Sequence, residues 1–276
     1  MSKSTVAVVI PVYKENMTVD ERKSLLQCLK ILGVYPIIFA CPEKLEVKEY
    51  QEPSDSFKSA SIRFERFDDD YFKSIAGYNR LLLSKEFYSR FKAFEYILIY
   101  QLDAWVFKDE LTLWCSKGFS YIGAPWLEAQ DKATPDSTFM KYAGNGGFSL
   151  RKIKSFLEVI NAYKIIKPPF EIMKEYQHFS LLLRFIRFPV ILLRFLGLRN
   201  NSNYQRAMYN LNEDNYWTTL APVISKKFKV AKAEEAISFA FETMPRRMFA
   251  LNHNQLPFGC HAWAKWDAEF WKQYIS

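Results

Sequence analysis

The sequence predicts a single α/β domain in which helices cover a mostly parallel sheet. Apolar runs without polar alternation recur in the N-terminal part of the chain, and this is typical of strands buried on both faces. Helical stretches separate these runs, and a strand-helix-strand order implies parallel crossovers. With 276 residues and 49% hydrophobic content, the chain is long enough to bury one substantial core. No repeat or low-complexity linker divides residues 1–276.

The predicted elements follow one another from the N-terminus. The strands are apolar or alternating runs at residues 5–13, 35–41, 61–67 and 96–100. The helices are predicted at residues 18–33, 72–91 and 109–117, with another after the sequence GNGGFSLRK. Residues 228–242 have a strand-like pattern.

Polar side chains directly follow three of the predicted strands. Lys14 and Glu15 follow the first, Asp68 to Asp70 follow the third, and Gln101 and Asp103 follow the strand at 96–100. In open α/β sheets, ligands bind at the carboxyl ends of the strands. We therefore expect these groups to converge on one crevice.

Composition narrows the classes of function. The four cysteines include no C-x-x-C pair, which disfavours a zinc ribbon or a disulfide scaffold and fits a reducing cytoplasm. The apolar run from Val6 to Val12 is shorter than a signal peptide requires. A net charge of +8 and a pI of about 9.1 favour an anionic partner, such as nucleic acid, phospholipid headgroups or a nucleoside diphosphate.

Three short segments offer candidate chemistry, each with a plainer alternative. Asp103 ends a buried strand, where a carboxylate suits a divalent cation but also caps turns. Asn212, Glu213 and Asp214 have the composition of a helix N-cap. The glycine-rich segment 144–147 permits close approach of a ligand to the backbone, or simply forms a turn. The residues alone leave these alternatives open.

Six sequence blocks occur in one order: VAVVIPVYKE, YILIYQLDAWVF, IGAPW, GNGGFSLRK, NEDNYW and LPFGCHAW. As an ordered set they resemble the GT-A glycosyltransferase superfamily, and more closely an uncharacterised bacterial family of GT-A-like proteins. The resemblance spans nearly the whole chain, with residues 160–205 least covered. It implies a GT-A fold, with a Rossmann-like, mixed and mostly parallel sheet, as a single catalytic domain with a basic and apolar helical insertion.

The resemblance assigns roles to individual residues. Asp103 matches the last Asp of the D-x-D metal motif, and His261 matches a histidine that supplies a further ligand to Mn²⁺ or Mg²⁺. Gln101 stands where the superfamily usually has the first Asp, although a neutral amide still hydrogen-bonds a ribose or a metal-bound water. Asp214 matches the Asp of the x-E-D motif, the base that deprotonates the acceptor hydroxyl in inverting enzymes.

The resemblance also implies two sets of binding residues. The nucleotide-sugar donor is expected to contact Pro11, Val12, Tyr13, Glu15, Asp68, Gln101, Asp103, Gly146 and Gly147. The sugar substrates are expected to contact Trp126, Asn145 and Glu213. Trp105, Trp217 and Trp263 are weaker candidates for stacking on a sugar, since most tryptophans belong to the core.

Residues 176–199 combine apolar side chains with recurring arginines. If this segment is helical despite Pro189, then Arg184, Arg187, Arg194 and Arg199 share one sector of the helix and the other sector is apolar. This pattern favours a helix lying on an anionic membrane surface rather than crossing the bilayer. The alternative is a buried helix pair broken at Pro189, with solvated arginines.

These observations predict an inverting, metal-dependent glycosyltransferase of hexosyltransferase type. It would move a sugar from a nucleotide donor, a UDP-sugar, to a glycan or lipid-linked oligosaccharide in bacterial surface polysaccharide synthesis. We expect a cytoplasmic protein, peripheral at the inner face of the plasma membrane, with no nucleic-acid partner. Two alternatives are a sugar nucleotidyltransferase, disfavoured by the absence of glycine in PVYKEN, and a non-catalytic protein that binds carbohydrate or nucleic acid.

Overall fold

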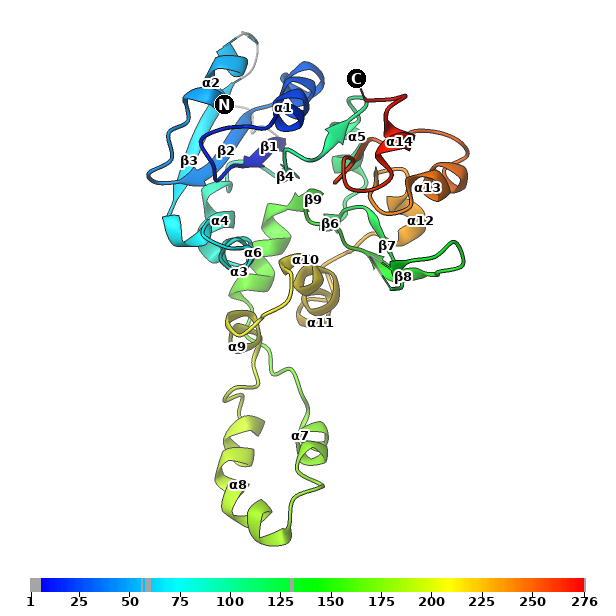
Figure 1. The fold of residues 1–276 in the computed structure, drawn as a ribbon. Helices are drawn as coiled ribbons and strands as arrows, with labels where there is room; N and C mark the ends of the chain where they lie inside the picture. The colour runs from blue at the N-terminus through cyan, green and yellow to red at the C-terminus, as the bar shows by residue number, and fades with distance from the viewer. Residues whose placement is uncertain (1–5, 56, 58–60, 130–131, 276) are drawn as a thin grey trace.

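The computed structural model describes residues 6–55, 57, 61–129 and 132–275. It confirms the α/β class, with a six-stranded sheet in the order β3-β2-β1-β4-β9-β6 (Figure 1). Its strands are β1 (Val6–Pro11), β2 (Ile37–Pro42), β3 (Ile62–Phe67), β4 (Tyr96–Tyr100), β9 (Phe148–Lys152) and β6 (Tyr121–Ile122). The first four pair in parallel, whereas β9 runs antiparallel to both β4 and β6.

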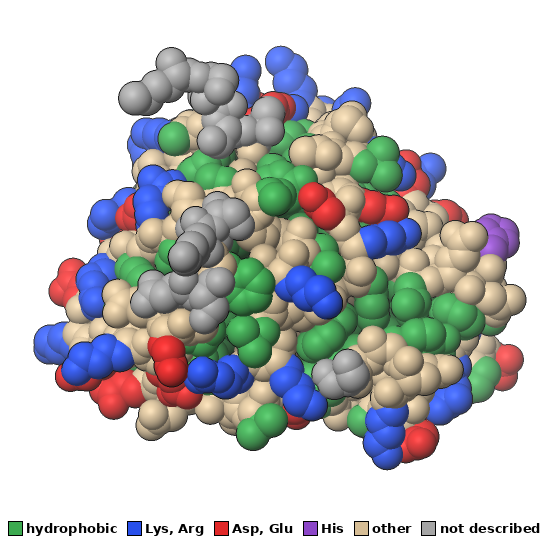
Figure 2. All heavy atoms as spheres, turned by 90° about the horizontal axis from the view of Figure 1, so that it is seen from above, with side chains coloured by type: hydrophobic (Ala, Val, Ile, Leu, Met, Phe, Trp, Pro, Cys, Tyr) green, Lys and Arg blue, Asp and Glu red, His purple; other side chains and the backbone are tan. Residues whose placement is uncertain are grey.

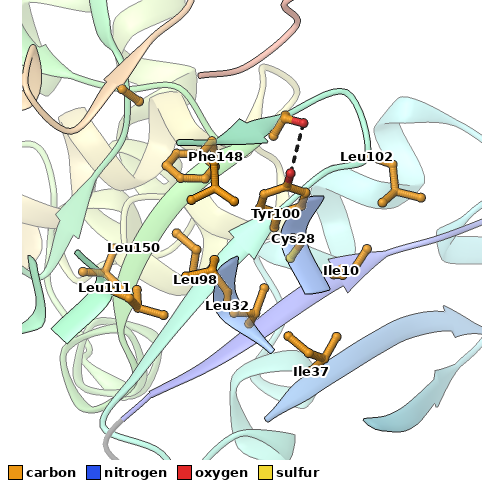
Figure 3. Packing of buried hydrophobic residues seen from close by; sticks show 14 of the residues in the cluster. Ile10, Cys28, Leu32, Ile37, Leu98, Tyr100, Leu102, Leu111, Phe148 and Leu150 are labelled. Carbon is orange, nitrogen blue, oxygen red and sulfur yellow. Dashed lines mark hydrogen bonds between the residues drawn. The ribbon is translucent and has the colours of Figure 1, made fainter. Parts of the chain in front are cut away.

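One face of the sheet is covered by α1 (Val19–Leu32), which connects β1 to β2. A capping box formed by Thr18 and Glu21 begins this helix. Figure 3 shows Cys28 and Leu32 of α1 close to Ile37 and Leu98 of the sheet, all of them buried. Because β4 is buried along its whole length and β1 as far as Ile10, their carboxyl ends hold the loops that follow in fixed positions.

The other face of the sheet packs against α3 (Ile75–Leu82), α4 (Lys85–Arg90) and α6 (Ile153–Asn161). The prediction of one continuous helix over 72–91 is wrong. Ser84 has an extended backbone, and its hydroxyl accepts the amide proton of Phe87, so it ends one helix and caps the next. A short 3-10 turn, η1 (Asp69–Tyr71), precedes α3, whose N-cap is Ser74.

The C-terminal part forms a smaller three-stranded sheet, in the order β10-β11-β5, beside the main one. Its strands are β5 (Trp105–Val106), β10 (Ala240–Phe241) and β11 (Gly259–Cys260), and a separate hairpin pairs β7 (Pro125–Leu127) with β8 (Phe139–Ala143). The predicted strand over 228–242 is mostly wrong. Within it, α12 (Ala233–Ala236) forms because Glu235 caps the backbone of Lys232, and β10 supplies the strand residues.

The remaining helices connect these layers. They are α2 (Lys48–Asp55), α5 (Leu111–Ser116), α9 (Ser202–Ala207), α10 (Glu213–Asn215), the π-helical turn η3 (Tyr216–Leu220), α11 (Ala221–Ile224), α13 (Pro245–Leu251) and α14 (Ala268–Trp271). In the C-terminal core, Trp271 of α14 packs beside Phe241 of β10, a strand of the smaller sheet.

A helical hairpin extends away from the body of the molecule (Figure 1). It consists of α7 (Pro169–Glu175) and α8 (Leu181–Phe195), and α8 runs through Pro189 without a break. The helix expected over 178–199 is therefore present but shorter, and Arg199 lies beyond its end. The alternative of a buried pair broken at Pro189 is wrong, because Ile191 is the buried residue of α8 while its other large apolar side chains are mainly exposed.

Candidate active site

A cleft with a volume of about 1080 Å³ opens at the carboxyl ends of β1 and β4. This is the size of a site for a substantial organic ligand. Its walls come from residues 11–14, 72–75, 78–79, 101–103, 126–127, 145–147, 210–215, 242–243, 261 and 265–266, with Glu21 and Tyr50. The cleft therefore lies at the sheet edge where the sequence predicted a crevice.

Three polar side-chain atoms meet beyond the end of β4. His261 Nε2 lies 3.1 Å from Gln101 Oε1 and 3.2 Å from Asp103 Oδ1. The amide nitrogen of Gln101 donates to the Tyr78 hydroxyl at 3.3 Å, which turns the amide oxygen toward the histidine. A carboxylate oxygen, an amide oxygen and an imidazole nitrogen in one place form a donor set that fits a divalent cation such as Mn²⁺.

The second nitrogen of His261 is held by Glu242. His261 Nδ1 lies 3.0 Å from Glu242 Oε1, which also accepts a hydrogen bond from Asn145 Nδ2 at 2.8 Å. Burial alone would lower the pKa of His261, but hydrogen bonds to Asp103 and Glu242 raise it to about 10. A carboxylate on Nδ1 fixes the ring so that Nε2 faces Asp103 and Gln101, as is usual for a metal-ligating histidine.

No group of three or more His, Cys, Asp and Glu side chains is arranged to hold a metal among the residues that the structure describes. The donor set identified here contains two such residues and the neutral Gln101. A cation bound there would leave coordination positions for phosphate oxygens and water, as Mg²⁺ and Mn²⁺ sites at phosphates do. Gln101, which replaces the first Asp of a D-x-D motif, thus still places an oxygen atom beside Asp103 and His261.

Two adjacent glycines separate this donor set from an acidic pair. A Cβ atom on Gly147 would lie 2.0 Å from His261 Nε2 and 2.6 Å from Gln101 Oε1. A Cβ atom on Gly146 would lie 2.7 Å from Glu213 Oε1. One loop therefore contacts both Gln101 and His261 and the acidic residues Glu213 and Asp214, and a Cβ at either glycine would displace these side chains.

Asp214 also lines the cleft, and backbone amides fix its carboxylate. Its Oδ2 accepts from Gly146 N at 3.1 Å, and its Oδ1 accepts from Asn215 N at 2.7 Å. Burial and the nearby carboxylate of Glu213 raise the pKa of Asp214 to about 8. A carboxylate with a raised pKa in a cleft is a candidate general base.

The neighbouring Glu213 is buried and paired with Arg151. The guanidinium of Arg151 donates to both carboxylate oxygens, at 2.7 and 3.0 Å, and also donates to the Tyr88 hydroxyl. Burial raises the pKa of Glu213, and the charge of Arg151 opposes that shift. Because Arg151 donates to both of its carboxylate oxygens, Glu213 holds the segment that carries Asp214, and its contact with a substrate stays a prediction. Arg151 was not singled out from the sequence.

Replacing Arg151 with methionine should destabilise the protein strongly. The change leaves the Glu213 carboxylate buried without its partner, and breaking a buried ion pair from one side typically costs about 3–5 kcal/mol. Urea denaturation of wild type and Arg151→Met measures the loss. The control is Arg246→Met, which breaks the exposed pair with Asp267 and should cost far less. Equal losses in the two variants would contradict the assigned role.

Asn212 begins α10 without acting as a side-chain cap. The helix starts at Glu213 as predicted, but the Asn212 side chain makes no capping hydrogen bond. Instead, Asn79 of α3 accepts the amide proton of Glu213 at 3.1 Å. The segment is therefore a helix start with Asn212 at the N-cap position, as its composition predicts, but a residue distant in sequence supplies the side-chain hydrogen bond.

The loop after β1 forms another wall of the cleft. Pro11, Val12 and Tyr13 line it, with Val12 buried and Tyr13 63% exposed. Two residues expected in the same place, Glu15 and Asp68, do not line the cleft. Asp68 instead accepts the amide proton of Asp70 and caps η1, and it follows β3, the edge strand of the sheet.

Aromatic side chains on the cleft include one predicted and one unexpected tryptophan. Trp126 is half-buried and its ring lies against Gly144, where a Cβ would be 2.4 Å from ring atoms. Trp266 also lines the cleft, although no sequence motif pointed to it. Trp105 and Trp217 belong to hydrophobic cores, which removes them as stacking candidates.

The N-terminal end of α3 also lines the cleft, and no sequence motif predicted this. Lys73, Ser74, Tyr78 and Asn79 face it from this helix and its preceding turn. Their amphipathic pattern is that of any surface helix, so no signal in the sequence distinguished them.

This fold is that of GT-A glycosyltransferases. The galactosyltransferase LgtC, solved in complex with donor and acceptor sugar analogs, aligns over 97% of this chain and 94% of its own, with 13% identity and a TM-score of 0.51. By sequence, residues 61–261 match a family described as "Protein of unknown function (DUF5672)", and the chain belongs to that family.

Two other solved structures are more distantly similar. A glycosyltransferase involved in the glycosylation of the major capsid of PBCV-1 has 11% identity over 96% of each chain, with a TM-score of 0.43. Core-mannan synthase A from Aspergillus fumigatus, in a Mn/GDP form, has 11% identity and a TM-score of 0.42. That match covers 56% of this chain and 61% of the synthase, less than two thirds of its length. No curated protein matches the sequence.

Proposed function

We propose that this protein is an inverting, metal-dependent glycosyltransferase that uses a nucleotide-sugar donor. The observation that carries the proposal is the meeting of two chemically different groups in one cleft. The donor set of Gln101, Asp103 and His261 lies on one side of Gly146 and Gly147, and the carboxylate of Asp214 lies on the other. Transfer of a sugar from a diphosphate needs both a cation site and a base.

Asp103 and His261, with Gln101 beside them, would hold Mn²⁺ or Mg²⁺. When bound, the cation neutralises the charge that develops on the departing diphosphate. Glu242 contributes by keeping His261 Nε2 directed toward the site. Pro11, Val12 and Tyr13 would contact the base and ribose, and the glycine loop leaves space for the sugar.

Asp214 would act as the base in a single displacement. The acceptor hydroxyl oxygen forms a bond to the anomeric carbon as the bond from that carbon to the diphosphate oxygen breaks. The hydroxyl proton passes to Asp214, and the electron pair of the broken bond leaves with the diphosphate. Attack on the face opposite the leaving group inverts the anomeric configuration. The Arg151–Glu213 pair and Asn79 position Asp214 for this step.

A UDP-sugar as donor and a glycan or lipid-linked oligosaccharide as acceptor complete the proposal. The support is the resemblance of the ordered sequence blocks together with the aromatic side chains of Trp126 and Trp266 at the cleft. A role in bacterial surface polysaccharide synthesis at the cytoplasmic side of the membrane fits such an acceptor.

Release of nucleoside diphosphate across a panel of nucleotide sugars, with and without Mn²⁺ or Mg²⁺, tests the proposal. Slow donor hydrolysis reports activity even when the acceptor is unknown. We expect metal-dependent release from one donor, and loss of that release in Asp103→Ala. Asp136→Ala, an exposed carboxylate outside the cleft, is the control. Absence of both release and binding for every donor would favour a non-catalytic binding protein.

The stereochemistry has its own test. The anomeric proton of the product, observed by nuclear magnetic resonance, distinguishes inversion from retention. Inversion is the expected result. Retention would remove Asp214 from the role of base while leaving the cation site as proposed.

A further inference from the structure

The outer face of α8 is an apolar surface without a partner among the described residues. At 100° per residue, Leu181, Phe185, Phe188, Leu192 and Leu196 form one stripe, and they are 47–82% exposed. This many adjacent large apolar side chains exceed the scattered exposure that is normal on a monomer, so the face marks an interaction site.

The hairpin is stabilised by its own apolar contacts and hydrogen bonds. On its inner side, Ile191 packs against Ile172 and Tyr176 of the α7 region. At its base, Asn200 Oδ1 accepts from Lys167 N at 2.9 Å, and its Nδ2 donates to the carbonyl oxygens of Lys167 and Arg194. These hydrogen bonds join the segment that enters the hairpin, at Lys167, to the segment that leaves it, at Asn200. The apolar stripe of α8 is therefore held on the outside of the hairpin.

The charge of this segment identifies the kind of partner. Residues 162–209 contain eight lysines and arginines and two glutamates, a net charge of +6 out of +8 for the whole chain. The charged residues of α8 are all arginines. By contrast, basic and acidic side chains are intermixed on the face at the opposite end of the molecule (Figure 2).

The four arginines of residues 176–199 fall into two groups, those that hold the hairpin together and those that are exposed. Arg194 pairs with Glu175 at 2.7 Å, and Arg184 donates to the carbonyl oxygens of Phe179 and Gln177, so both hold the hairpin together. Arg187 and Arg199 are exposed. These two cations, together with the exposed stripe, resemble the composition of helices that lie in the headgroup region of membranes.

We propose that the α7–α8 hairpin docks the protein on an anionic lipid bilayer. The stripe of α8 would enter the boundary between headgroups and acyl chains, while Arg187 and Arg199 contact lipid phosphates. None of the helices among the described residues is long and apolar enough to cross a membrane. The helix therefore lies on the surface rather than spanning it.

Docking would also tether the domain that contains the cleft to the bilayer. After the hairpin, the chain passes through α9 to residues 210–214, the segment of the cleft that carries the candidate base. This consequence rests on the proposed function and fits a lipid-linked acceptor. Membrane binding itself does not require glycosyl transfer.

Vesicle co-sedimentation of the full chain, without any substrate, tests the docking. We expect binding to vesicles containing about one third phosphatidylglycerol at low salt, and at least about tenfold weaker binding to phosphatidylcholine alone or at high salt. The variant Leu181→Ser/Phe185→Ser should lose at least about tenfold in affinity. Its matched control, Val34→Ser/Leu113→Ser, alters exposed apolar side chains outside the hairpin and should bind normally.

A charge-reversal pair tests the electrostatic part. Arg187→Glu/Arg199→Glu should weaken binding to anionic vesicles by about tenfold or more, whereas Lys23→Glu/Lys30→Glu on α1 should change it little. Two results would overturn the proposal. One is a wild type that ignores anionic vesicles at low salt. The other is an apolar-pair variant that binds vesicles normally but converts a dimer to a monomer in sedimentation, which would assign the face to a second copy.

Discussion

Replacing Asp214 with asparagine should lower kcat for sugar transfer by about 10²–10⁴, the usual contribution of a positioned general base. Asparagine has nearly the same shape but does not accept the acceptor's proton. KM for the nucleotide sugar should change little, because asparagine keeps the shape of the side chain and an acceptor oxygen beside the amides of Gly146 and Asn215. Steady-state kinetics with an identified donor and acceptor measure both constants.

Two comparisons make this result specific. Asp136→Asn removes an exposed carboxylate outside the cleft and should retain wild-type kcat. Thermal unfolding of Asp214→Asn should show a folded protein, since the substitution removes a carboxylate that burial disfavours. A folded variant with more than about a tenth of wild-type kcat would show that another group takes the proton.

The pH dependence of kcat/KM should follow the ionisation of the Asp214 carboxylate. Burial and Glu213 raise the pKa of Asp214 to about 8 from its ordinary value of 3.8. A base works in its ionised form, so kcat/KM should increase as pH rises through about 8. The folded protein binds this proton more tightly than the unfolded chain, so the stability that Asp214 contributes is present below pH 3.8 and is lost as pH rises through 8. A pH profile that stays flat from 6 to 9 would contradict the assignment.

The sequence predicts the central sheet well because its strands are buried on both faces. Val6–Pro11 and Tyr96–Tyr100 are apolar throughout, and their polar continuations at Tyr13 and at Gln101 to Asp103 reach the cleft as expected. Asp68 follows an edge strand with a mixed pattern, and its side chain caps η1 instead. Strand position within the sheet, which sequence order does not fix, decided which strand ends meet.

The supporting residues of the site were harder to predict. Arg151 and Glu213 are 62 positions apart, and Glu242 and His261 directly follow two different strands of the smaller sheet, β10 and β11. Each residue, taken alone, has the appearance of an ordinary surface charge in the sequence. Their roles depend on burial and on pairing across the fold, and neither is visible in local patterns. The roles of the cleft residues in binding and catalysis stay predictions.

Replacing Gly147 with alanine should abolish metal-dependent donor turnover, with an expected loss of at least about 10² in kcat/KM. A Cβ atom at this position would lie 2.0 Å from His261 Nε2 and 2.4 Å from its Cδ2. Real atoms do not approach so closely, so the imidazole must move. The donors at Gln101, Asp103 and His261 would then no longer meet, and the affinity for Mn²⁺ should fall together with the activity.

Gly118 provides a control that separates the loss of the cation site from the general cost of replacing a glycine with alanine. Gly118 has a φ of +74°, and a Cβ there has nothing within 4 Å. Gly118→Ala therefore costs backbone energy outside the cleft and should keep wild-type Mn²⁺ affinity and turnover. Titration of Mn²⁺ monitored by calorimetry gives the affinity without any substrate. If Gly147→Ala bound Mn²⁺ as tightly as Gly118→Ala, the cation would not be held by His261, and the three donors would have a structural role instead.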